Sequence, residues 1–294
     1  MKNSLLLGAH MSIEGGLYRA LERGHSVGCT TIQIFTRNNS RWLSRDLMEE
    51  EVKQFQQTKS QNEIHPVFAH CSYLINLAAG NEFYEKSIAG LITEVMRAEI
   101  LGLPFVVLHP GAHMGCGEDE GLIRATAALN CVIEETSNAK CKIVIENTAG
   151  QGSCIGCKME HLSYFWNHVQ DQNRLGFCID TCHLFAAGYD IRTEQTYVET
   201  FTRLLDCVPL ESIHAFHLND SKKPLRSNVD RHEHIGKGKI GRNAFRFLLN
   251  DVRFLNVPKV LETPKGKDLA EDVMNLRILR LLVKKESVRK ETWR

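Results

Sequence analysis

The sequence predicts a single TIM-type (β/α)8 barrel over residues 1–283, followed by a basic C-terminal tail at 284–294. Short apolar or β-branched runs alternate with longer stretches whose apolar residues recur at helical spacing, and this alternation is typical of parallel βαβ units. Eight such runs share 294 residues, and roughly 37 residues per unit is a workable length for a βα repeat. Because no Pro/Gly/Ser-rich linker divides the chain, we expect one domain.

The predicted strands are short runs that carry the signals of buried parallel strands. In chain order they cover Ser4–His10, Thr31–Thr36, Pro66–His70, Phe105–His109, Lys142–Glu146, Leu175–Asp180, Ser212–His217 and Pro258–Glu262. Between them the helical pattern is clearest in Tyr84–Leu101, Glu120–Glu135 and Leu269–Val283. The longest irregular stretch, Asn219–Lys239, is predicted to be a functional loop. A doubly wound open sheet is the alternative, but no strand is followed by a G-x-G-x-x-G loop.

The composition is that of an ordinary globular protein, with 43% hydrophobic and 24% charged residues. The formal charge is only +1, so a surface for nucleic acid would have to come from local clustering of basic residues. The apolar run at residues 5–7 is too short for a signal peptide, and no stretch is long enough for a membrane span. We therefore expect a cytoplasmic protein with no membrane partner.

Ten cysteines are present, and several lie inside apolar runs, such as Cys178. This placement indicates buried, reduced thiols rather than disulfides. Cys154 and Cys157 form a lone C-x-x-C with no second pair at zinc-ribbon spacing, so loop cysteines are expected there, with a structural or redox role as the alternative.

Metal-ligating residue types stand at the ends of six predicted strands. They are His70, His109, Glu146, Asp180, His217 and Glu262. Because the C-terminal ends of parallel barrel strands all lie at one face, where active sites are built, we expect these side chains to share one rim. One histidine at a strand end is more often structural, but ligand residues at the ends of six successive strands are not expected by chance.

Three more residues extend this set. His183 follows Asp180 by three residues, and Asp230 and His232 lie two apart in the long loop, where an extended segment puts them on one face. Nine ligands match three zinc ions with about three protein ligands each. Mixed imidazole and carboxylate ligation suits zinc, with manganese or iron as alternatives, and clustered cations of this kind indicate phosphoester hydrolysis. His10 and His234 are expected to be structural or to lie behind the ligands.

The segments around these residues resemble the endonuclease IV family of abasic-site endonucleases over nearly the whole chain. The matching segments are Gly8–His10, Ser72–Leu77, His109–Gly111, Ile145–Gly152, Cys178–His183, Ala186–Asp190, His217–Asp220, Asp230–His232 and Leu261–Thr263. So many segments in the right order make the resemblance specific. One departure is Cys71, where the family often has an acidic residue, so a contact behind the ligands is expected to differ.

The resemblance implies a barrel with three zinc ions. Its ligand sets would be His70, His109 and Glu146; Glu146, Asp180, His217 and Glu262; and His183, Asp230 and His232. It also implies that a hydroxide held between zinc ions attacks the phosphate 5′ to an abasic site in double-stranded DNA. The products would be a 3′-hydroxyl and a 5′-deoxyribose phosphate, and blocked 3′ ends would also be trimmed. Glu146 and Glu262 are the carboxylates best placed to orient or deprotonate the water, and no obligate protein partner is expected.

Two loops beside the rim are candidate DNA contacts. Tyr73 and Leu74 follow the third strand, where an aromatic and an aliphatic side chain can wedge into a base stack weakened by the missing base. The alternative is that both cap the barrel core. Arg37 and Arg41, after the second strand, are both candidates for entering the DNA gap. The excess of Lys and Arg in residues 219–242 fits contacts to the phosphate backbone.

Two other functions stay open at this point. A sugar isomerase or epimerase on a similar barrel also gathers His, Asp and Glu at strand ends, but it generally needs two metals in a small closed pocket. The third ligand set and the loop with Tyr73 and Leu74 disfavour an isomerase or epimerase. A DNA-lesion-binding protein with structural metals is the other alternative, and it is disfavoured because structural zinc sites are usually closed and rich in cysteine.

Overall fold

The barrel is closed by eight parallel strands in the computed structural model, which describes residues 5–80 and 82–284. Around the barrel the strand order is β1-β10-β7-β6-β5-β4-β3-β2. The bounds are β1 (Leu7–Met11), β2 (Thr31–Phe35), β3 (Val67–His70), β4 (Phe105–Leu108), β5 (Lys142–Glu146), β6 (Leu175–Asp180), β7 (Ile213–His217) and β10 (Lys259–Leu261). The predicted fold class is confirmed.

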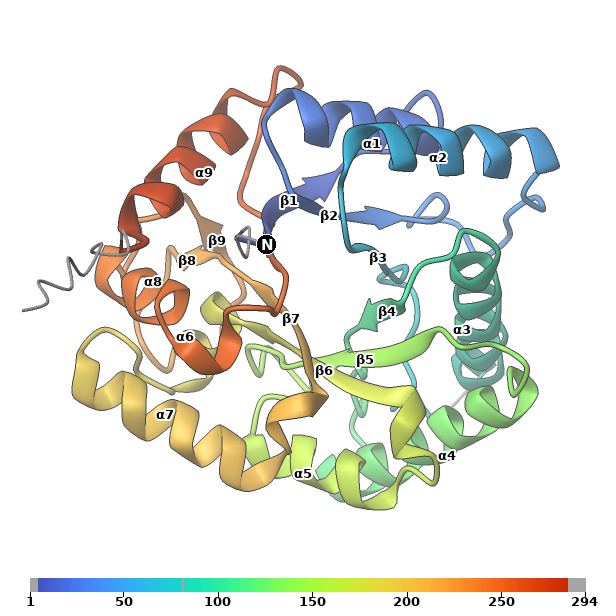
Figure 1. The fold of residues 1–294 in the computed structure, drawn as a ribbon. Helices are drawn as coiled ribbons and strands as arrows, with labels where there is room; N and C mark the ends of the chain where they lie inside the picture. The colour runs from blue at the N-terminus through green and yellow to red at the C-terminus, as the bar shows by residue number, and fades with distance from the viewer. Residues whose placement is uncertain (1–4, 81, 285–294) are drawn as a thin grey trace, which may run out of the picture.

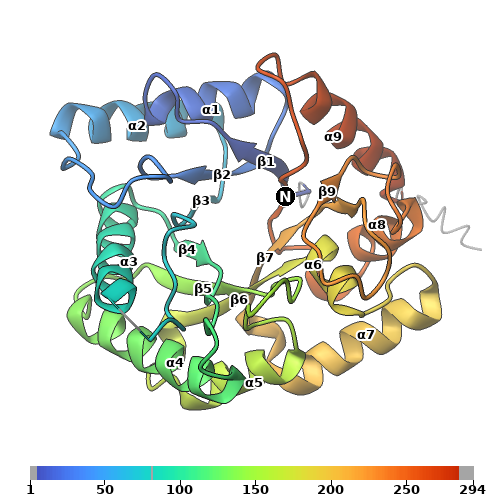
Figure 2. The same ribbon diagram turned by 180° about the vertical axis from the view of Figure 1, so that it is seen from behind.

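Helices surround this ring of strands, as Figures 1 and 2 show from opposite sides. Their bounds are α1 (Leu17–Ser26), α2 (Glu49–Asn62), α3 (Glu82–Ile100), α4 (Glu118–Glu135), α5 (Met159–His168), α6 (Thr181–Ala187), α7 (Glu194–Cys207), α8 (Arg242–Leu249) and α9 (Ala270–Leu282). Among these described segments, no helix combines the length and the apolarity that crossing a membrane would need. Of the basic tail expected at 284–294, only Lys284 belongs to the described residues, and Ser4 of the first predicted strand lies outside them too.

Two apolar layers explain why these runs form a barrel. Strands β4, β5 and β6 are almost continuous apolar runs, as expected of parallel strands covered on both faces. One buried cluster fills the barrel interior, with Phe68, Phe105, Val144, Ala215 and Val260 contributed by different strands. A larger cluster lies between the strands and the helices. All ten cysteines are free, as the sequence predicted.

The register of the strands sets the level of the rim. Phe35 pairs with His70, Glu146 with Cys178, and Asp180 with His217, so the ends of neighbouring strands are aligned. His109 and Glu262 each follow the last residue of their strand, β4 and β10. The strand-end residues picked out in the sequence therefore point to one end of the barrel.

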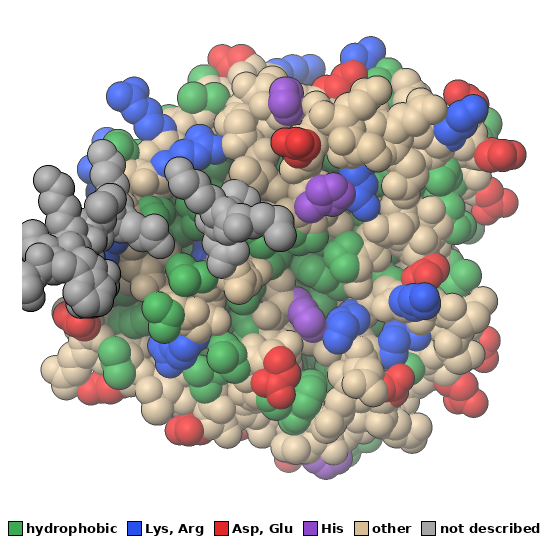
Figure 3. Space-filling view, viewed as in Figure 1, with side chains coloured by type: hydrophobic (Ala, Val, Ile, Leu, Met, Phe, Trp, Pro, Cys, Tyr) green, Lys and Arg blue, Asp and Glu red, His purple; other side chains and the backbone are tan. Residues whose placement is uncertain are grey.

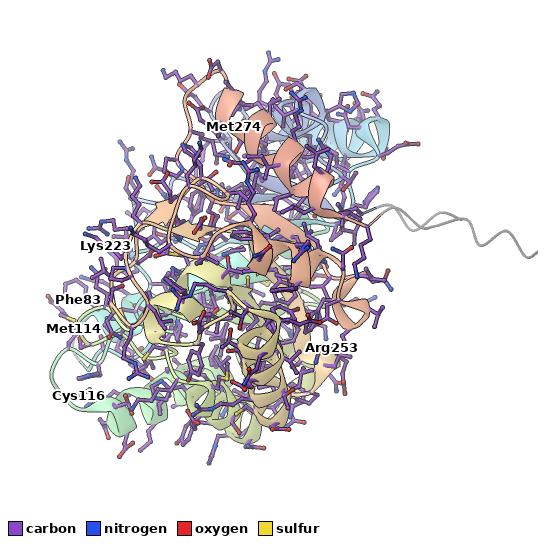
Figure 4. All side chains as sticks on the ribbon, turned by 90° about the vertical axis from the view of Figure 1, so that its left-hand side faces the viewer. Phe83, Met114, Cys116, Lys223, Arg253 and Met274 are labelled. Atoms are coloured by element: carbon purple, nitrogen blue, oxygen red, sulfur yellow. The ribbon has the colours of Figure 1, made fainter. Side chains whose placement is uncertain are left out.

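The long segment after β7 is more ordered than the sequence predicted. It contains a two-stranded antiparallel sheet, β8 (Asp220–Ser221) with β9 (His232–Glu233), in which Ser221 pairs with His232. Charges of both signs are interspersed on the face of the molecule seen in Figure 3. Figure 4 shows Lys223, Met114 and Cys116, from loops that follow barrel strands, at one edge of the molecule, and Arg253 at the opposite edge.

Candidate metal centre

The structure brings all nine predicted ligands together at the C-terminal end of the barrel. They fall into three groups whose ligand atoms lie within 4.8 Å of one another. The groups are His70, His109 and Glu146; Glu146, Asp180, His217 and Glu262; and His183, Asp230 and His232. These are the same sets that the family resemblance implied, and Glu146 belongs to two of them.

Glu146, at the end of β5, is fully buried and lies at the centre of the cluster. Its Oε2 is 3.2 Å from His70 Nε2 and 3.3 Å from His109 Nε2, while its Oε1 is 3.0 Å from His217 Nδ1. Burial opposes ionisation of this carboxyl, but His217 and His109 outweigh burial and hold its pKa well below the usual range. Glu146 is therefore a carboxylate surrounded by imidazoles.

Three carboxylates converge on one ring nitrogen of His217. Its Nδ1 lies 3.0 Å from Glu146, 3.2 Å from Glu262 and 3.9 Å from Asp180. The other nitrogen, Nε2, is 2.8 Å from Oε1 of Gln33, which can only accept a hydrogen bond. In the neutral tautomer that donates to Gln33, the Nδ1 lone pair faces three anionic groups. A cation bound among them removes this repulsion, so the donor set fits a metal ion.

The other histidines repeat this arrangement. His183 Nδ1 is 2.8 Å from the carbonyl oxygen of Asn147, His70 Nδ1 is 2.7 Å from that of Cys71, and His232 Nδ1 is 3.1 Å from that of Glu262. Each ring is thus oriented by a backbone carbonyl and turns Nε2 to the cluster, as metal-ligating histidines do. The buried Nε2 atoms of His183 and His232 have no hydrogen-bond partner of good geometry among the described residues, which is the second sign that these residues fit a metal.

Asp230 joins those two histidines. Its carboxylate oxygens lie 3.1 Å from His183 Nε2 and 3.2 Å from His232 Nε2. Burial opposes ionisation of Asp230, but the close contacts with both imidazoles lower its pKa far below the usual range. Burial likewise opposes protonation of His232, but Asp180 leads the groups that raise its pKa to about 9. In a metal-free protein the third set is therefore an ion cluster held by protons on its histidines.

Amides behind the ligands were missed by the sequence reasoning. Gln33 donates from Nε2 to Glu262 Oε1 at 2.6 Å, while its oxygen faces His217. Asn219 donates to Asp180 at 2.6 Å and accepts from the backbone N–H of Glu262 at 2.9 Å. The available signal was a polar residue inside the buried strand β2 and an asparagine two residues after the β7 ligand. Both amides fix the orientation of ligands.

Asp220 was also missed, although it holds the loop that carries two of the ligands. Its buried carboxylate accepts backbone hydrogen bonds from Gly236 at 2.9 Å, Gly238 at 3.0 Å and Ile240 at 2.9 Å. A Cβ at position 238 would lie 2.4 Å from the backbone oxygen of Ser221, so the close approach requires glycine. Since Ser221 pairs with His232, this carboxylate fixes the base of the loop.

One further group of potential ligand atoms combines Asp180 and His232 with Cys182. The Cys182 thiol faces the carbonyl oxygen of Arg231 at 3.7 Å, and burial raises its pKa to about 12. A protonated thiol is a poor metal ligand. Cys154 lines the smaller of two cavities beside the site, and burial raises the pKa of its thiol as well. His10 lies 3.6 Å from Glu262 and lines the larger cavity with it, and His234 contacts Asn275.

Two cavities flank the cluster. The larger, of about 710 Å³, is lined by Glu262, His10, Phe35 and Tyr73 among others. The smaller, of about 220 Å³, is lined by His109, His183, Asp230, Cys154 and Arg231 among others. The ligands thus lie between two openings.

The two candidate DNA-contact loops border the larger cavity. Tyr73 is 62% exposed and packs edge-on against Phe35 at 5.7 Å, and Leu74 beside it is half-buried. Arg41 is exposed. Arg37 is not exposed: its guanidinium is buried in an ion pair with Glu94 at 2.7 Å. Its Nε and Nη1 donors bind groups of the protein, whereas Nη2 has no partner among the described residues and Arg37 also lines the larger cavity, so a contact of Arg37 with DNA stays a prediction.

The fold and the rim of histidines and carboxylates define a metal-dependent enzyme on a parallel barrel, and the comparisons agree. The family model described as a xylose isomerase-like TIM barrel matches residues 21–280. A protein of Chloroflexus aggregans named probable endonuclease 4 is 49% identical over 278 residues, 94% of this chain and 97% of that protein.

Solved structures give the same result. The crystal structure of endonuclease IV from Thermus thermophilus matches with a TM-score of 0.84 and 34% identity, over 94% of this chain and 98% of that one. The chain belongs to the endonuclease IV family. A D-tagatose 3-epimerase-like protein also matches, over 94% of this chain and 96% of that one, with a TM-score of 0.72. At 19% identity, that likeness shows only the shared fold.

Proposed function

We propose that this protein is a zinc-dependent endonuclease that hydrolyses the phosphodiester 5′ to an abasic site in double-stranded DNA. It leaves a 3′-hydroxyl and a 5′-deoxyribose phosphate, and it also trims blocked 3′ ends. Membership of the endonuclease IV family supports the reaction class. The observation that carries the proposal is the sharing of Glu146 between two ligand sets, because one carboxylate common to both sets would bring two ions close enough to act on the same phosphate.

The three ligand sets would hold three zinc ions, with manganese or iron as substitutes. Bound there, such ions supply a Lewis acid for the phosphate, a water of lowered pKa and neutralisation of charge on the attacking and leaving oxygens. The protein's own contribution is to keep the ligands ionised and correctly turned. Gln33, Asn219 and the backbone carbonyl of Asn147 perform this orientation.

Glu262 is the carboxylate best placed to take a proton from the attacking water. Its side chain is 13% exposed and lines the larger cavity, whereas Glu146 is fully buried. Burial opposes ionisation of Glu262, but His217 lowers its pKa far below the usual range, which keeps it anionic. The Gln33 amide at 2.6 Å fixes one oxygen and leaves the other facing the cluster. We therefore assign Glu146 to metal binding and Glu262 to both metal binding and proton transfer.

The surroundings of the cluster favour an extended substrate over a free sugar. Ligands of the cluster line both cavities, Glu262 the larger and His109, His183 and Asp230 the smaller, which leaves space for substrate on two sides of the metal centre. Tyr73 lines the larger cavity, with its ring 6.4 Å from that of His109. An exposed aromatic ring at that point can occupy the gap left by a missing base.

The test is cleavage of a duplex that contains one tetrahydrofuran abasic analogue, with the matching intact duplex as the control. The expected result is a single cut 5′ to the analogue that leaves a 3′-hydroxyl. The same preparation is incubated with ketohexoses to test the epimerase alternative. Epimerisation of a sugar without any cut in the duplex would overturn the proposal.

A further inference from the structure

We propose that Glu94, on α3, is a positioning residue that joins the β2 loop (residues 36–45) and the β3 loop (residues 71–75) into one DNA-recognition surface. This inference rests on the proposed function, because the two loops carry Arg41 and Tyr73. Glu94 itself belongs to none of the ligand groups and lines neither cavity beside them. It therefore acts through the loops.

The carboxylate of Glu94 binds both loops directly. Oε2 accepts a hydrogen bond from the Thr36 hydroxyl at 2.6 Å, and Oε1 accepts one from Arg37 Nε at 2.7 Å. Oε1 also lies 3.3 Å from the backbone nitrogen of Ser72, which donates to it. Thr36 directly follows β2, and Ser72 comes two residues after the end of β3. One buried side chain thus holds the roots of two loops.

From these roots the hydrogen bonds continue into the loops. Arg37 donates from Nη1 to the carbonyl oxygens of Arg41 at 2.6 Å and Trp42 at 2.9 Å. The Ser72 hydroxyl donates to the carbonyl oxygen of Asn39 at 2.5 Å, which links the two loops to each other. The backbone of Arg41 and the residue preceding Tyr73 are therefore connected through Glu94 and Arg37.

A second residue one turn along α3 holds the far end of the β2 loop. Arg97 donates from Nη2 to the carbonyl oxygen of Thr36 at 2.6 Å and from Nη1 to that of Arg45 at 2.9 Å. The loop is thus fixed to α3 at both ends. Without these contacts its backbone would be free to move relative to the β3 loop.

Burial of the Glu94 carboxylate opposes folding, and its contacts with the two loops explain why it is nevertheless there. Its neighbours on the buried face of α3 are apolar, including Leu91, Val95 and Ala98. The Glu94 and Arg37 side chains are each 2% exposed, and a buried ion pair of this kind is often no more stable than an apolar pair of the same shape. What the pair does supply is a fixed arrangement of the loops before DNA arrives, which lowers the entropic cost of binding.

The test compares Glu94→Gln with a matched control, Asp251→Asn. Asp251 is also a poorly exposed carboxylate, 9% exposed, that binds an arginine (Arg253) and a hydroxyl (Tyr197), but it lies in the segment between α8 and the start of β10, away from the strand ends that carry the ligands. For the abasic duplex, Glu94→Gln is expected to raise KM about ten- to a hundredfold, while kcat stays within about threefold of wild type. Asp251→Asn is expected to leave both unchanged. Equal metal content in all three proteins is part of the expected result.

Hydrogen exchange gives a readout that does not depend on activity. Glu94→Gln is expected to speed exchange in residues 37–45 and 72–74, and Asp251→Asn to leave exchange in both segments as in wild type. Unchanged exchange in these segments, or a lower kcat at unchanged KM, would overturn the inference. If wild type does not cut the abasic duplex, the proposed function fails, while the exchange measurement still decides whether Glu94 holds the two loops together.

Discussion

Glu146 and Glu262 direct carboxylate oxygens at the same atom, Nδ1 of His217, at 3.0 and 3.2 Å. One N–H can donate a good hydrogen bond to only one of them. In the metal-free protein, burial opposes a charge on His217, but the surrounding anionic groups raise its pKa well above the usual value. The site therefore needs positive charge, from protons on its histidines or from metal ions.

Removal of metal is expected to abolish cleavage and to destabilise the protein. Metal at about a thousandfold excess over its dissociation constant contributes about 4 kcal/mol to the folded state, which corresponds to a fall in Tm of about 10 °C on chelation. Calorimetry before and after dipicolinate treatment measures this shift, and readdition of zinc should restore Tm and activity together. Elemental analysis of the untreated protein should find about three transition-metal ions per chain. Fewer than about two would count against the trinuclear site.

Glu262→Gln is expected to slow cleavage of the abasic duplex by about 10²- to 10⁴-fold, because the amide cannot accept the proton of the attacking water. Binding of the duplex should change by no more than a few-fold, since Glu262 is not a cationic contact to the phosphate backbone. Single-turnover rates and a binding isotherm separate the two effects. Glu99→Gln, which alters a carboxylate that binds the backbone N–H groups of Lys140 and Cys141, is the control. An unchanged rate in Glu262→Gln would contradict the assignment.

The barrel and the strand-end residues could be predicted because both depend on patterns of neighbouring residues in the sequence. Parallel strands are short apolar runs, and the residue that ends such a run must lie at the rim. The residues that hold the ligands are different: Gln33 is recognisable only once His217 is known to lie 2.8 Å away on another strand.

The burial of Arg37 could not be predicted for the same reason. Arg37 directly follows the second predicted strand, as a residue at the rim would, but its partner, Glu94, is 57 residues further along the chain. The two-stranded sheet of β8 and β9 was missed because each strand has only two residues, too few to show a periodic pattern. Apart from this small sheet, the sequence failed to reveal the long-range polar contacts.

Asp220→Asn is expected to weaken the third ligand set without touching a ligand. The substitution removes a carboxylate that accepts several backbone hydrogen bonds at the base of the loop that carries Asp230 and His232. Hydrogen bonds to a charged group contribute about 1.5–3 kcal/mol each, so a loss of about 3 kcal/mol in unfolding free energy is expected. Metal analysis should show that about one ion per chain is lost first on dilution. Retention of all metal at wild-type affinity would show that the loop does not depend on Asp220.

Tyr73→Ala is expected to impair recognition of the lesion, whereas Tyr73→Phe should behave as wild type. The ring packs against Phe35, and stacking of an aromatic ring on a base contributes about 1–3 kcal/mol. Tyr73→Ala should therefore raise KM for the abasic duplex by about ten- to a hundredfold. The comparison with Phe isolates the ring from the hydroxyl. If Ala and Phe give the same KM as wild type, Tyr73 only caps the barrel, as the alternative interpretation of the sequence holds.

His214 is expected to make the protein less stable in acid for a reason separate from the metal site. Burial lowers its pKa from 6.5 to about 4, with a smaller contribution from Lys142, and its ring stacks on Phe105. Between these two pKa values the unfolded chain binds a proton that the folded chain does not, so acidification favours unfolding. The resulting loss of unfolding free energy is complete below the pKa of His214 in the folded protein and amounts to at most about 3 kcal/mol.

Urea unfolding of metal-free wild type and His214→Gln at pH 6.5 and pH 4.5 tests this effect. The variant should be less stable at pH 6.5, because it loses the stacked ring, but its stability should fall less between the two pH values. His25→Gln, which alters an exposed histidine, is the control and should keep the wild-type pH dependence. The carboxylates and histidines of the metal centre are the same in all three proteins, so their titration cancels in the comparison. Equal falls in all three would mean that His214 is protonated in the folded protein.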